Sequence, residues 1–309
     1  MTSRAKTLIC IVGPTAVGKT TTAIGVASTY QTEIISADSR QFYREMNIGT
    51  AKPDTKERSV IPHHFIDSHS ITENYSAGDY EVDVLKLLEE LFKKHNLLIM
   101  VGGSGLFINA ACYGLDKLPK PAPGVRKALT QSYEDKGVTY LQERLKEVDP
   151  AYYQEVDPQN PQRMIRALEV FETTGVAFSK WRKKDLALRN FNILPIGLHM
   201  DREELYDRIN LRVDQMLENG LLEEVRSLLP YREKAPLQSV GYSELFEYLD
   251  GSISLERAIE LIKRNSRRYA KRQLTWFRKM PDIQWFESHE TKAIKTYIDD
   301  SLDGEQQAN

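Results

Sequence analysis

The residues with the clearest chemical signature form a loop close to the start of the chain. The stretch from Gly13 to Thr20 reads Gly-Pro-Thr-Ala-Val-Gly-Lys-Thr and matches the phosphate-loop pattern G-x-x-x-x-G-K-[ST]. Its glycines let successive backbone N–H groups face an anion, and the helix that follows adds the positive potential of its N-terminus. Lys19 adds a mobile positive charge, and the Thr20 hydroxyl can bind Mg²⁺. The loop predicts a ligand that contains a diphosphate, which is a wider class than ATP.

Two more polar residues follow predicted strands. Asp38 ends the run 33–38, and Ser104 lies in a glycine-rich turn after the run 97–101. The carboxyl ends of parallel strands form the ligand-binding edge of an open α/β sheet. At that edge Asp38 can hold a metal or accept a proton, and the Ser104 hydroxyl can donate to a phosphate or leaving oxygen. Each can equally be an ordinary turn residue, so position alone leaves both roles open.

One expected residue of an ATPase is missing. The run 97–101 ends in Gly102-Gly103, where an ATPase carries the acid that holds Mg²⁺ or orients water. No arginine-rich segment marks itself as a nucleotide-kinase lid. The machinery for ATP hydrolysis is therefore incomplete.

Strand and helix patterns alternate along much of the chain. Runs of strand length lie at 8–12, 33–38, 97–101 and 193–198, and helical patterns at 21–27, 77–94 and 106–111. This alternation predicts an α/β fold with a P-loop NTPase-like parallel sheet flanked by helices. Residues 42–78 are rich in breakers and are expected to be mostly loop. Pro195 cannot donate a ladder hydrogen bond, so its strand is expected to be at an edge or to start there.

A proline-rich break at 118–124 indicates an exit from this core. Residues 125–185 then carry helical patterns and many charges without a strong strand. We expect an inserted helical region at 119–190, with the α/β core formed by 1–118 and 191–309.

Two later helices carry basic residues. Asp201 is a suitable N-cap for a helix that ends at Gly220, and Arg208 and Arg212 lie four residues apart on one face of it. A longer helix at 254–279 has an apolar stripe with two polar interruptions and many flanking cations. Those cations are typical of a phosphate-backbone contact, or of a solvated basic face. The polar tail after residue 287 is expected to fray.

Composition narrows the class of protein. The chain has 309 residues, a net charge of −2 and two cysteines, which argues for a reducing compartment and against a disulfide framework. No Cys/His spacing suits zinc, and His63 and His64 are expected to pack or form hydrogen bonds. No run is long enough to span a membrane, and the first apolar run leads into the phosphate loop, so it is a core strand rather than a signal peptide.

Several short motifs occur together in a fixed order. Besides the phosphate loop they cover 36–41 (SADSRQ), 48–53 (IGTAKP), 62–67 (PHHFID), 101–106 (VGGSGL), 160–170 (NPQRMIRALEV), 240–242 (VGY) and 271–278 (KRQLTWFR). This set closely resembles the tRNA dimethylallyltransferase family, the bacterial tRNA isopentenyltransferases, over almost the whole chain. The order and joint presence of the motifs make the resemblance specific.

The resemblance implies a prenyl transfer, in which N6 of adenosine 37 of a tRNA attacks C1 of dimethylallyl diphosphate and releases diphosphate. It implies that Asp38 is the general base and that Ser104, where many members carry threonine, donates to the leaving oxygen. The phosphate loop with Mg²⁺ at Thr20 would then stabilise the leaving diphosphate. The donor-binding residues implied are Gly13, Thr15, Ala16, Val17, Gly18, Lys19 and Thr20, with Arg208 and Arg212 as weaker candidates.

The resemblance also implies a partner, the anticodon stem-loop of tRNA, whose target base must flip out for N6 to be reached. The tRNA-binding residues implied are Asp38, Ser39, Arg40, Gln41, Ser104, Arg126, Gln162, Arg163, Met164, Ile165, Arg166, Lys271 and Arg272. We expect a monomeric, cytoplasmic enzyme without a membrane partner. Two alternatives stay open: a P-loop small-molecule kinase with ATP in the loop and Asp38 activating a hydroxyl, and a non-catalytic RNA-binding protein.

Overall fold

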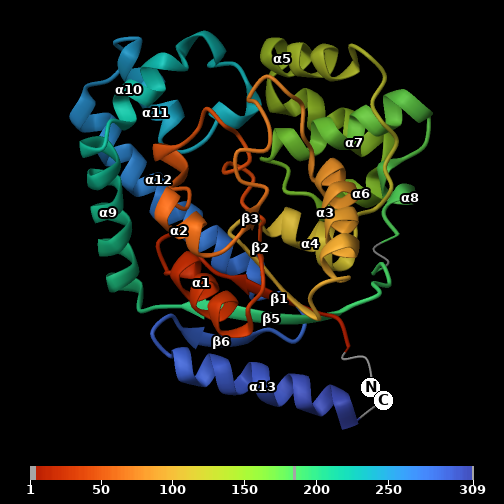
Figure 1. The fold of residues 1–309 in the computed structure, drawn as a ribbon. Coiled ribbons are helices and arrows are strands. Elements are labelled where there is room, and N and C mark those ends of the chain that lie inside the picture. Colours follow the sequence, from red (N-terminus) through yellow and green to blue (C-terminus); the bar gives the residue numbers. More distant parts are fainter. Residues whose placement is uncertain (1–4, 184–185, 308–309) are drawn as a thin grey trace. The chain divides into compact units, whose positions relative to one another are not determined.

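The computed structural model describes residues 5–183 and 186–307, and it divides into two compact units. The first unit is Met1–Tyr113 with Leu188–Asn309, and the second is Gly114–Ala187. Figure 1 shows the course of the chain through both. Within the described residues, no helix is long and apolar enough to cross a membrane.

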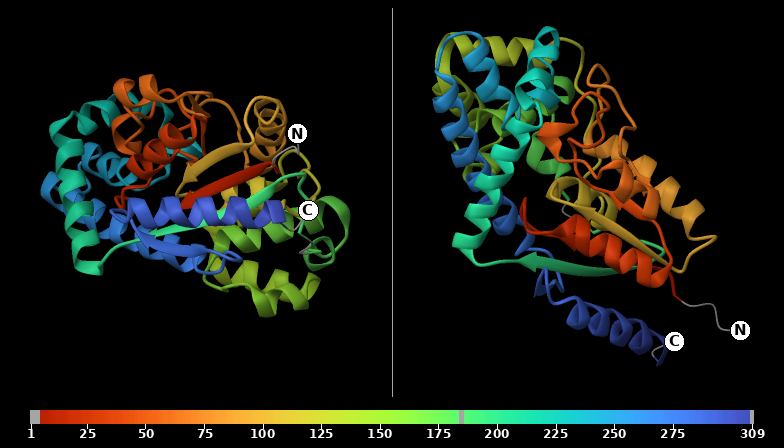
Figure 2. Two further views of the ribbon diagram at one scale, coloured as in Figure 1. Left: turned by 60° about the horizontal axis from the view of Figure 1, so that its bottom comes forward. Right: turned by 60° about the vertical axis from the view of Figure 1, so that its left-hand side comes forward.

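The first unit is built on one parallel sheet of six strands in the order β3-β2-β4-β1-β5-β6. In the left view of Figure 2, β4, β1, β5 and β6 follow one another from gold through red and green to blue. The strands are β1 (Thr7–Val12), β2 (Ile34–Ser36), β3 (His63–His64), β4 (Leu97–Gly102), β5 (Asn192–His199) and β6 (Gln284–Glu287). The predicted parallel α/β sheet is confirmed.

Side chains alternate across the sheet, so each strand supplies two cores. From β1, Leu8, Cys10 and Val12 join one buried cluster, whereas Ile9 and Ile11 join the other. The first cluster is covered by helices α3 (Ala77–Leu91) and α4 (Gly105–Tyr113), and the second by α1 (Lys19–Tyr30), α9 (Arg202–Glu218) and α13 (Thr291–Gln307). Helices on both faces leave the carboxyl edge of the strands as the place for loops.

A third buried cluster joins three more helices of this unit to the loop after β2. The helices are α10 (Leu221–Ser227), α11 (Tyr242–Leu249) and α12 (Leu255–Phe277), with 3-10 turns η1 (Ile48–Thr50) and η3 (Ala235–Leu237). The unit also contains α2 (Thr55–Val60) and the 3-10 turn η2 (Leu229–Tyr231). Tyr43 and Met46 from the loop pack with Leu245 of α11 and Ile262 of α12. The cluster fixes the loop and the basic helix α12 against each other.

The expected position of β5 is wrong. This strand lies between β1 and β6, and Pro195 is in register with Cys10 of β1. Its ladder with β6 runs over Ile196–His199, so Pro195 lies before that ladder begins. Proline has no N–H to donate, but at this position β6 does not yet pair with β5. The missing hydrogen bond therefore costs little, and proline is tolerated.

The expected fraying of the tail is also wrong. β6 adds an edge strand, and α13 follows it along the outer side of the sheet (Figure 1). Ile294 and Ile298 of α13 are fully buried in the second core cluster. They lie one helical turn apart, so a mostly polar tail still presents an apolar stripe that packing stabilises.

The second unit is all helical: α5 (Val125–Val148), α6 (Pro150–Glu155), α7 (Pro161–Thr174) and α8 (Phe178–Trp181). It has its own core, with Leu141, Leu145, Met164 and Leu168 fully buried. Asp149 and Asn160 cap α6 and α7, and a proline follows each cap. The structure puts the unit at 114–187 where the sequence suggested 119–190, and residues 184–185 lie outside the described residues. Its role in RNA binding stays a prediction.

Candidate active site

The loops after β1 and β2 and the end of β4 line one cavity of about 1220 Å³. Its wall includes Lys19 and Thr20 of the phosphate loop, Asp38 after β2 and Gly102 at the end of β4. Helices α9 and α12 complete it, since Arg212 and Tyr269 also line it. The sheet topology therefore brings together most of the polar residues that the sequence placed at the carboxyl edge.

The phosphate loop has the backbone that its glycines predict. Gly13 and Gly18 have φ angles of 152° and 107°, and Ala16 is left-handed at 66°. A Cβ on Gly13 would lie 2.6 Å from the carbonyl oxygen of Leu198 in β5. Val17 is fully buried in the core and anchors the loop. Gly13 and Val17 are thus framework residues, and the cavity is lined by Thr15, Ala16, Gly18, Lys19 and Thr20.

Lys19 is held back against the loop. Its Nζ donates a hydrogen bond of 2.7 Å to the carbonyl oxygen of Pro14. Burial lowers the pKa of Lys19 to about 8, Asp38 opposes the shift, and Arg212 adds to it. The ammonium group of Lys19 is partly removed from water, and only one carbonyl hydrogen bond offsets that loss. An anion in the cavity would therefore stabilise its charged form.

Arg212 of α9 is the second half-buried cation of the cavity. Burial lowers the pKa of its guanidinium, and the carboxylate of Asp38 opposes the shift. Arg208, one turn earlier, also lines the cavity but is exposed, and its guanidinium lies 4.0 Å from the sulfur of Met200. The two arginines predicted for the donor are therefore unequal, with Arg212 the inner one.

The pKa of Lys19 predicts how pH affects anion binding. A diphosphate favours protonated Lys19, so affinity is full below about pH 8 and falls as the free protein loses that proton. The loss approaches about tenfold per pH unit above that value. Calorimetric titration with Mg²⁺ and diphosphate from about pH 7 to about pH 9.5 measures it.

The control for this titration is Lys19→Arg. A guanidinium stays charged over the whole range, so the ratio of the two dissociation constants cancels the ligand's own ionisation. A ratio that does not change with pH would assign the titration to another group.

Asp38 and its neighbours form a tight turn after β2. An Asp38 carboxylate oxygen accepts a hydrogen bond of 3.1 Å from the backbone N–H of Arg40. The charge of Asp38 also acts on Lys19 and Arg212, which places all three in one electrostatic cluster. The carboxylate and both cations line the same cavity, so all three can meet one ligand.

Ser104 is linked to this turn rather than standing alone. Its Oγ accepts a hydrogen bond of 2.9 Å from the backbone N–H of Ser39 and donates one of 3.0 Å to Ser39 Oγ. A Cβ on Gly102 would lie 2.3 Å from the carbonyl oxygen of Ala37, so only glycine lets the two loops approach this closely. Asp38 and Ser104 are thus held together by backbone contacts between the loops after β2 and β4.

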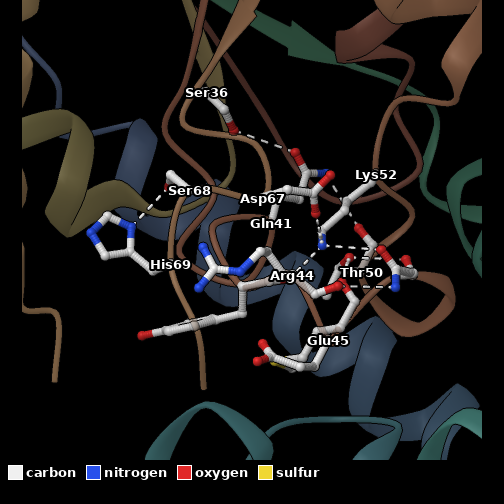
Figure 3. Close-up of polar contacts among 12 residues, drawn as sticks. Ser36, Gln41, Arg44, Glu45, Thr50, Lys52, Asp67, Ser68 and His69 are labelled. Atoms are coloured by element: carbon white, nitrogen blue, oxygen red, sulfur yellow. Dashed lines mark hydrogen bonds and ion pairs between the residues drawn. The ribbon is translucent and has the colours of Figure 1, made fainter. Parts of the chain in front are cut away.

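Gln41 holds the next loop in place. Figure 3 shows its amide between Ser36 and the loop at Thr50. Its Oε1 accepts from Ser36 Oγ at 3.3 Å, and its Nε2 donates to the carbonyl oxygens of Thr50 and Ala51, both at 3.3 Å. Both ends of this amide are engaged within the protein, which favours a supporting role over a direct contact with RNA.

Lys52 and Glu224 fix the same loop from two sides. Lys52 Nζ bonds Asp67 at 2.5 Å and also the carbonyl oxygen of Tyr43 (Figure 3). The Glu224 carboxylate of α10 accepts from the backbone N–H groups of three successive residues, Asn47 to Gly49, and from the hydroxyl of Tyr242. The IGTAKP and VGY motifs therefore shape the cavity wall.

The comparisons with known proteins agree with this geometry. The family model described as IPP transferase matches residues 41–280. The chain belongs to the IPP transferase family. The resemblance predicted from the motifs is confirmed.

Relatives of this IPP transferase match it over nearly its full length. A protein of Christiangramia forsetii named tRNA dimethylallyltransferase is 53% identical over 296 residues, 96% of this chain and 98% of that protein. The tRNA isopentenylpyrophosphate transferase of Bacillus halodurans has a TM-score of 0.73 and 38% identity, covering 98% of this chain and 99% of that one. A eukaryotic dimethylallyltransferase, solved acting on tRNA, has a TM-score of 0.76 and 28% identity, covering 92% and 74%.

In the second unit of this IPP transferase, the predicted RNA contacts gather around one buried acid. Glu169 is fully buried and pairs with Arg126 and Arg166, each at 3.3 Å, while Arg126 also donates to Gln162 at 3.0 Å. Arg163 is exposed beside this group. The remaining two predicted contacts, Met164 and Ile165, are buried in the helical core, so their side chains support the helix that carries the others.

Sequence reasoning missed two residues of α12 that line the cavity. Gln273 bonds the phosphate loop, and Tyr269 faces Asp38, whose charge together with burial raises the pKa of Tyr269 to about 12. For Gln273 the available signal was its place as a polar interruption of the apolar stripe. Lys271 and Arg272 are both exposed, and Arg272 also lines the cavity.

The histidines behave as expected from the sequence. His63 Nδ1 lies 2.7 Å from the carbonyl oxygen of Ile61, and His64 Nε2 lies 2.6 Å from a Glu33 carboxylate oxygen. Among the described residues, no group of three or more His, Cys, Asp or Glu side chains is placed to bind a metal.

Proposed function

We propose that this enzyme transfers the dimethylallyl group of dimethylallyl diphosphate to N6 of adenosine 37 in tRNA and releases diphosphate. The observation that carries the proposal is one cavity that holds a phosphate loop, the half-buried cations Lys19 and Arg212, and the carboxylate of Asp38. The relatives' names point to the same activity.

The cations suit the charge that develops on the donor. As the bond between C1 and oxygen breaks, its electron pair passes to the diphosphate. Backbone N–H groups of the loop, Lys19 and Arg212 are already in place to stabilise this charge, so little reorganisation is needed during the reaction. Lys19 exchanges its bond to Pro14 for the diphosphate.

Asp38 suits the other half of the reaction. The exocyclic amine of adenine is a weak nucleophile because its lone pair is delocalised into the ring. As the bond between N6 and C1 forms, the amine must lose a proton, and Asp38 accepts it. Ser104 donates to Ser39 Oγ in the adjoining turn and would exchange this bond to donate to the leaving oxygen.

Magnesium fits this site as a partner of the diphosphate. Mg²⁺ in phosphate sites keeps several waters and takes one or two protein ligands along with phosphate oxygens. Thr20 lines the cavity and supplies the hydroxyl. When bound, the ion neutralises charge on the leaving group.

We propose that RNA is held by exposed residues of both units. In the second unit these are Arg126, Gln162 and Arg163 with the half-buried Arg166, and on α12 they are Lys271 and Arg272. Asp38 to Arg40 face the base that flips into the cavity. We propose a monomer that acts in the cytoplasm, because one chain lines the described cavity and tRNA is the proposed substrate.

One assay separates the proposal from its alternatives. Purified protein is incubated with unmodified tRNA, labelled dimethylallyl diphosphate, Mg²⁺ and, in parallel, labelled ATP. Transfer of the prenyl label to RNA is the expected result. Phosphorylation of a small molecule would instead indicate a kinase, and RNA binding without transfer would indicate a binding protein. The glycines that end β4, in place of an ATPase acid, favour the transferase.

Neutralising two exposed cations of α12 tests the RNA contact. We expect Lys271→Ser with Arg272→Ser to weaken tRNA binding and to lower the slope of log Kd against log salt by about 2. Filter binding at a series of salt concentrations measures this slope. The matched control neutralises Lys292 and Lys295, two exposed lysines of α13. If both double variants gave the same slope, the cations of α12 would be an ordinary solvated face and not an RNA contact.

A further inference from the structure

Gln273 joins two loops of the active site through a single buried amide. Its Oε1 accepts a hydrogen bond of 2.8 Å from the backbone N–H of Thr15 in the phosphate loop. Its Nε2 donates one of 2.9 Å to the carbonyl oxygen of Gly103 in the turn that carries Ser104. The side chain is 6% exposed, so both bonds are made in a largely dry environment where an unmade bond is costly.

The surrounding glycines show how closely this helix and turn approach. A Cβ on Gly103 would lie 2.3 Å from Gln273 Nε2 and 3.8 Å from Lys19 Nζ. A Cβ on Gly105 would lie 2.2 Å from the Trp276 ring of the same helix. Side chains of α12 therefore pack closely against Gly103 and Gly105, the two residues that flank Ser104. The Gln273 amide lies at the end of the cavity where Lys19 is placed to bind a phosphate.

We propose that Gln273 is a positioning residue that fixes the separation between the phosphate loop and the Ser104 turn. In the proposed reaction the phosphate loop holds the diphosphate, and the Ser104 turn donates to its leaving oxygen. The distance between the two loops therefore decides whether both can act on one donor molecule. A misplacement of a reacting group by about 1 Å can cost about 100-fold in rate. The inference rests on the proposed function, since it assigns Gln273 a part in that reaction.

The same bond also orders Thr15. Its N–H is turned to Gln273, which leaves the N–H groups further along the loop for the diphosphate. An apolar side chain in place of Gln273 would leave the Thr15 N–H and the Gly103 carbonyl unpaired. Both loops would then shift to find new partners.

Two variants test the role. We expect Gln273→Met, which keeps the length of the side chain but neither bond, to lower kcat about 100-fold. Binding of inorganic diphosphate with Mg²⁺ should weaken about tenfold, because the loop loses one fixed partner. Gln273→Glu places a carboxylate beside the diphosphate and should bind it more weakly still. Binding of the anticodon stem-loop should stay within about twofold for both.

The control removes a different side-chain contact of the same helix. Lys263 Nζ bonds Asp214 of α9 at 2.7 Å, and Lys263→Met breaks that contact without reaching the phosphate loop. We expect it to change Tm without changing the diphosphate Kd. The proposal is overturned if Gln273→Glu binds diphosphate as well as Gln273→Met, or if the kcat of Gln273→Met stays within about threefold of wild type. A wrong proposed function would give a different result, because the wild-type protein itself would then transfer no label to RNA.

Discussion

Replacing Asp38 by alanine is expected to lower kcat by about 10³-fold, within the range that a positioned general base contributes. The amine of adenine then has no carboxylate to accept its proton as the bond to carbon forms. RNA and diphosphate should still bind, because the phosphate loop and the exposed cations are untouched. Single-turnover transfer of label, with separate binding of each substrate, measures these effects.

Two features of the site shape this experiment. The charge of Asp38 helps keep Lys19 protonated, so its removal lowers the pKa of Lys19 further below about 8. The assay is therefore run near pH 6.5 to 7, about one unit or more below the Lys19 pKa of the unaltered protein, so that Lys19 stays mostly charged. Asp38→Asn is the control, because it keeps the bond from the Arg40 N–H but has little basicity. An alanine variant with kcat near wild type would assign the base to another group.

Replacing Lys19 by methionine is the second change with a large expected effect. The cavity keeps its volume but loses the cation that faces the leaving group. We expect kcat/KM for dimethylallyl diphosphate to fall by about 10²- to 10³-fold, the loss found when one preorganised donor is removed. The tRNA Kd should not change by more than about twofold.

The partition of this loss tests what the loop holds. A cation that acts on the leaving group mainly in the transition state lowers kcat, whereas one that binds donor and transition state equally raises KM alone. Burial and the single bond to Pro14 favour the first outcome, since Lys19 gains most when charge builds up. A variant whose KM for tRNA rises as much as its KM for the donor would contradict a donor site at the loop.

Much of the fold could be predicted because its signals are local. The apolar runs of β1 and β4 and the caps of α7 and α9 are set by neighbouring residues. Pairing order is not local, so the edge position expected from Pro195 is wrong, and β6 was missed. The tail after residue 287 forms α13 because Ile294 and Ile298 meet a core that no window of sequence shows.

The site followed the same division. Motif residues such as Lys19, Asp38 and Ser104 could be placed at one sheet edge from chain order and topology. Gln41 shows the limit of that reasoning, because its amide is taken up by Ser36 and the loop at Thr50. A motif indicates that a residue is functional. Its contacts in the folded protein show whether it reaches the substrate or supports another residue that does.

By itself, the sequence predicted a diphosphate ligand, an acid after the second strand and a basic helix late in the chain. These features depend on residue type and short spacing, which act through backbone geometry and local charge. Only the tertiary structure decided that Arg212 joins Lys19 and Asp38, and that Gln273 ties Thr15 to Gly103. Those pairs lie far apart along the chain, and packing of α9 and α12 against the sheet is what brings their charges and hydrogen bonds within reach.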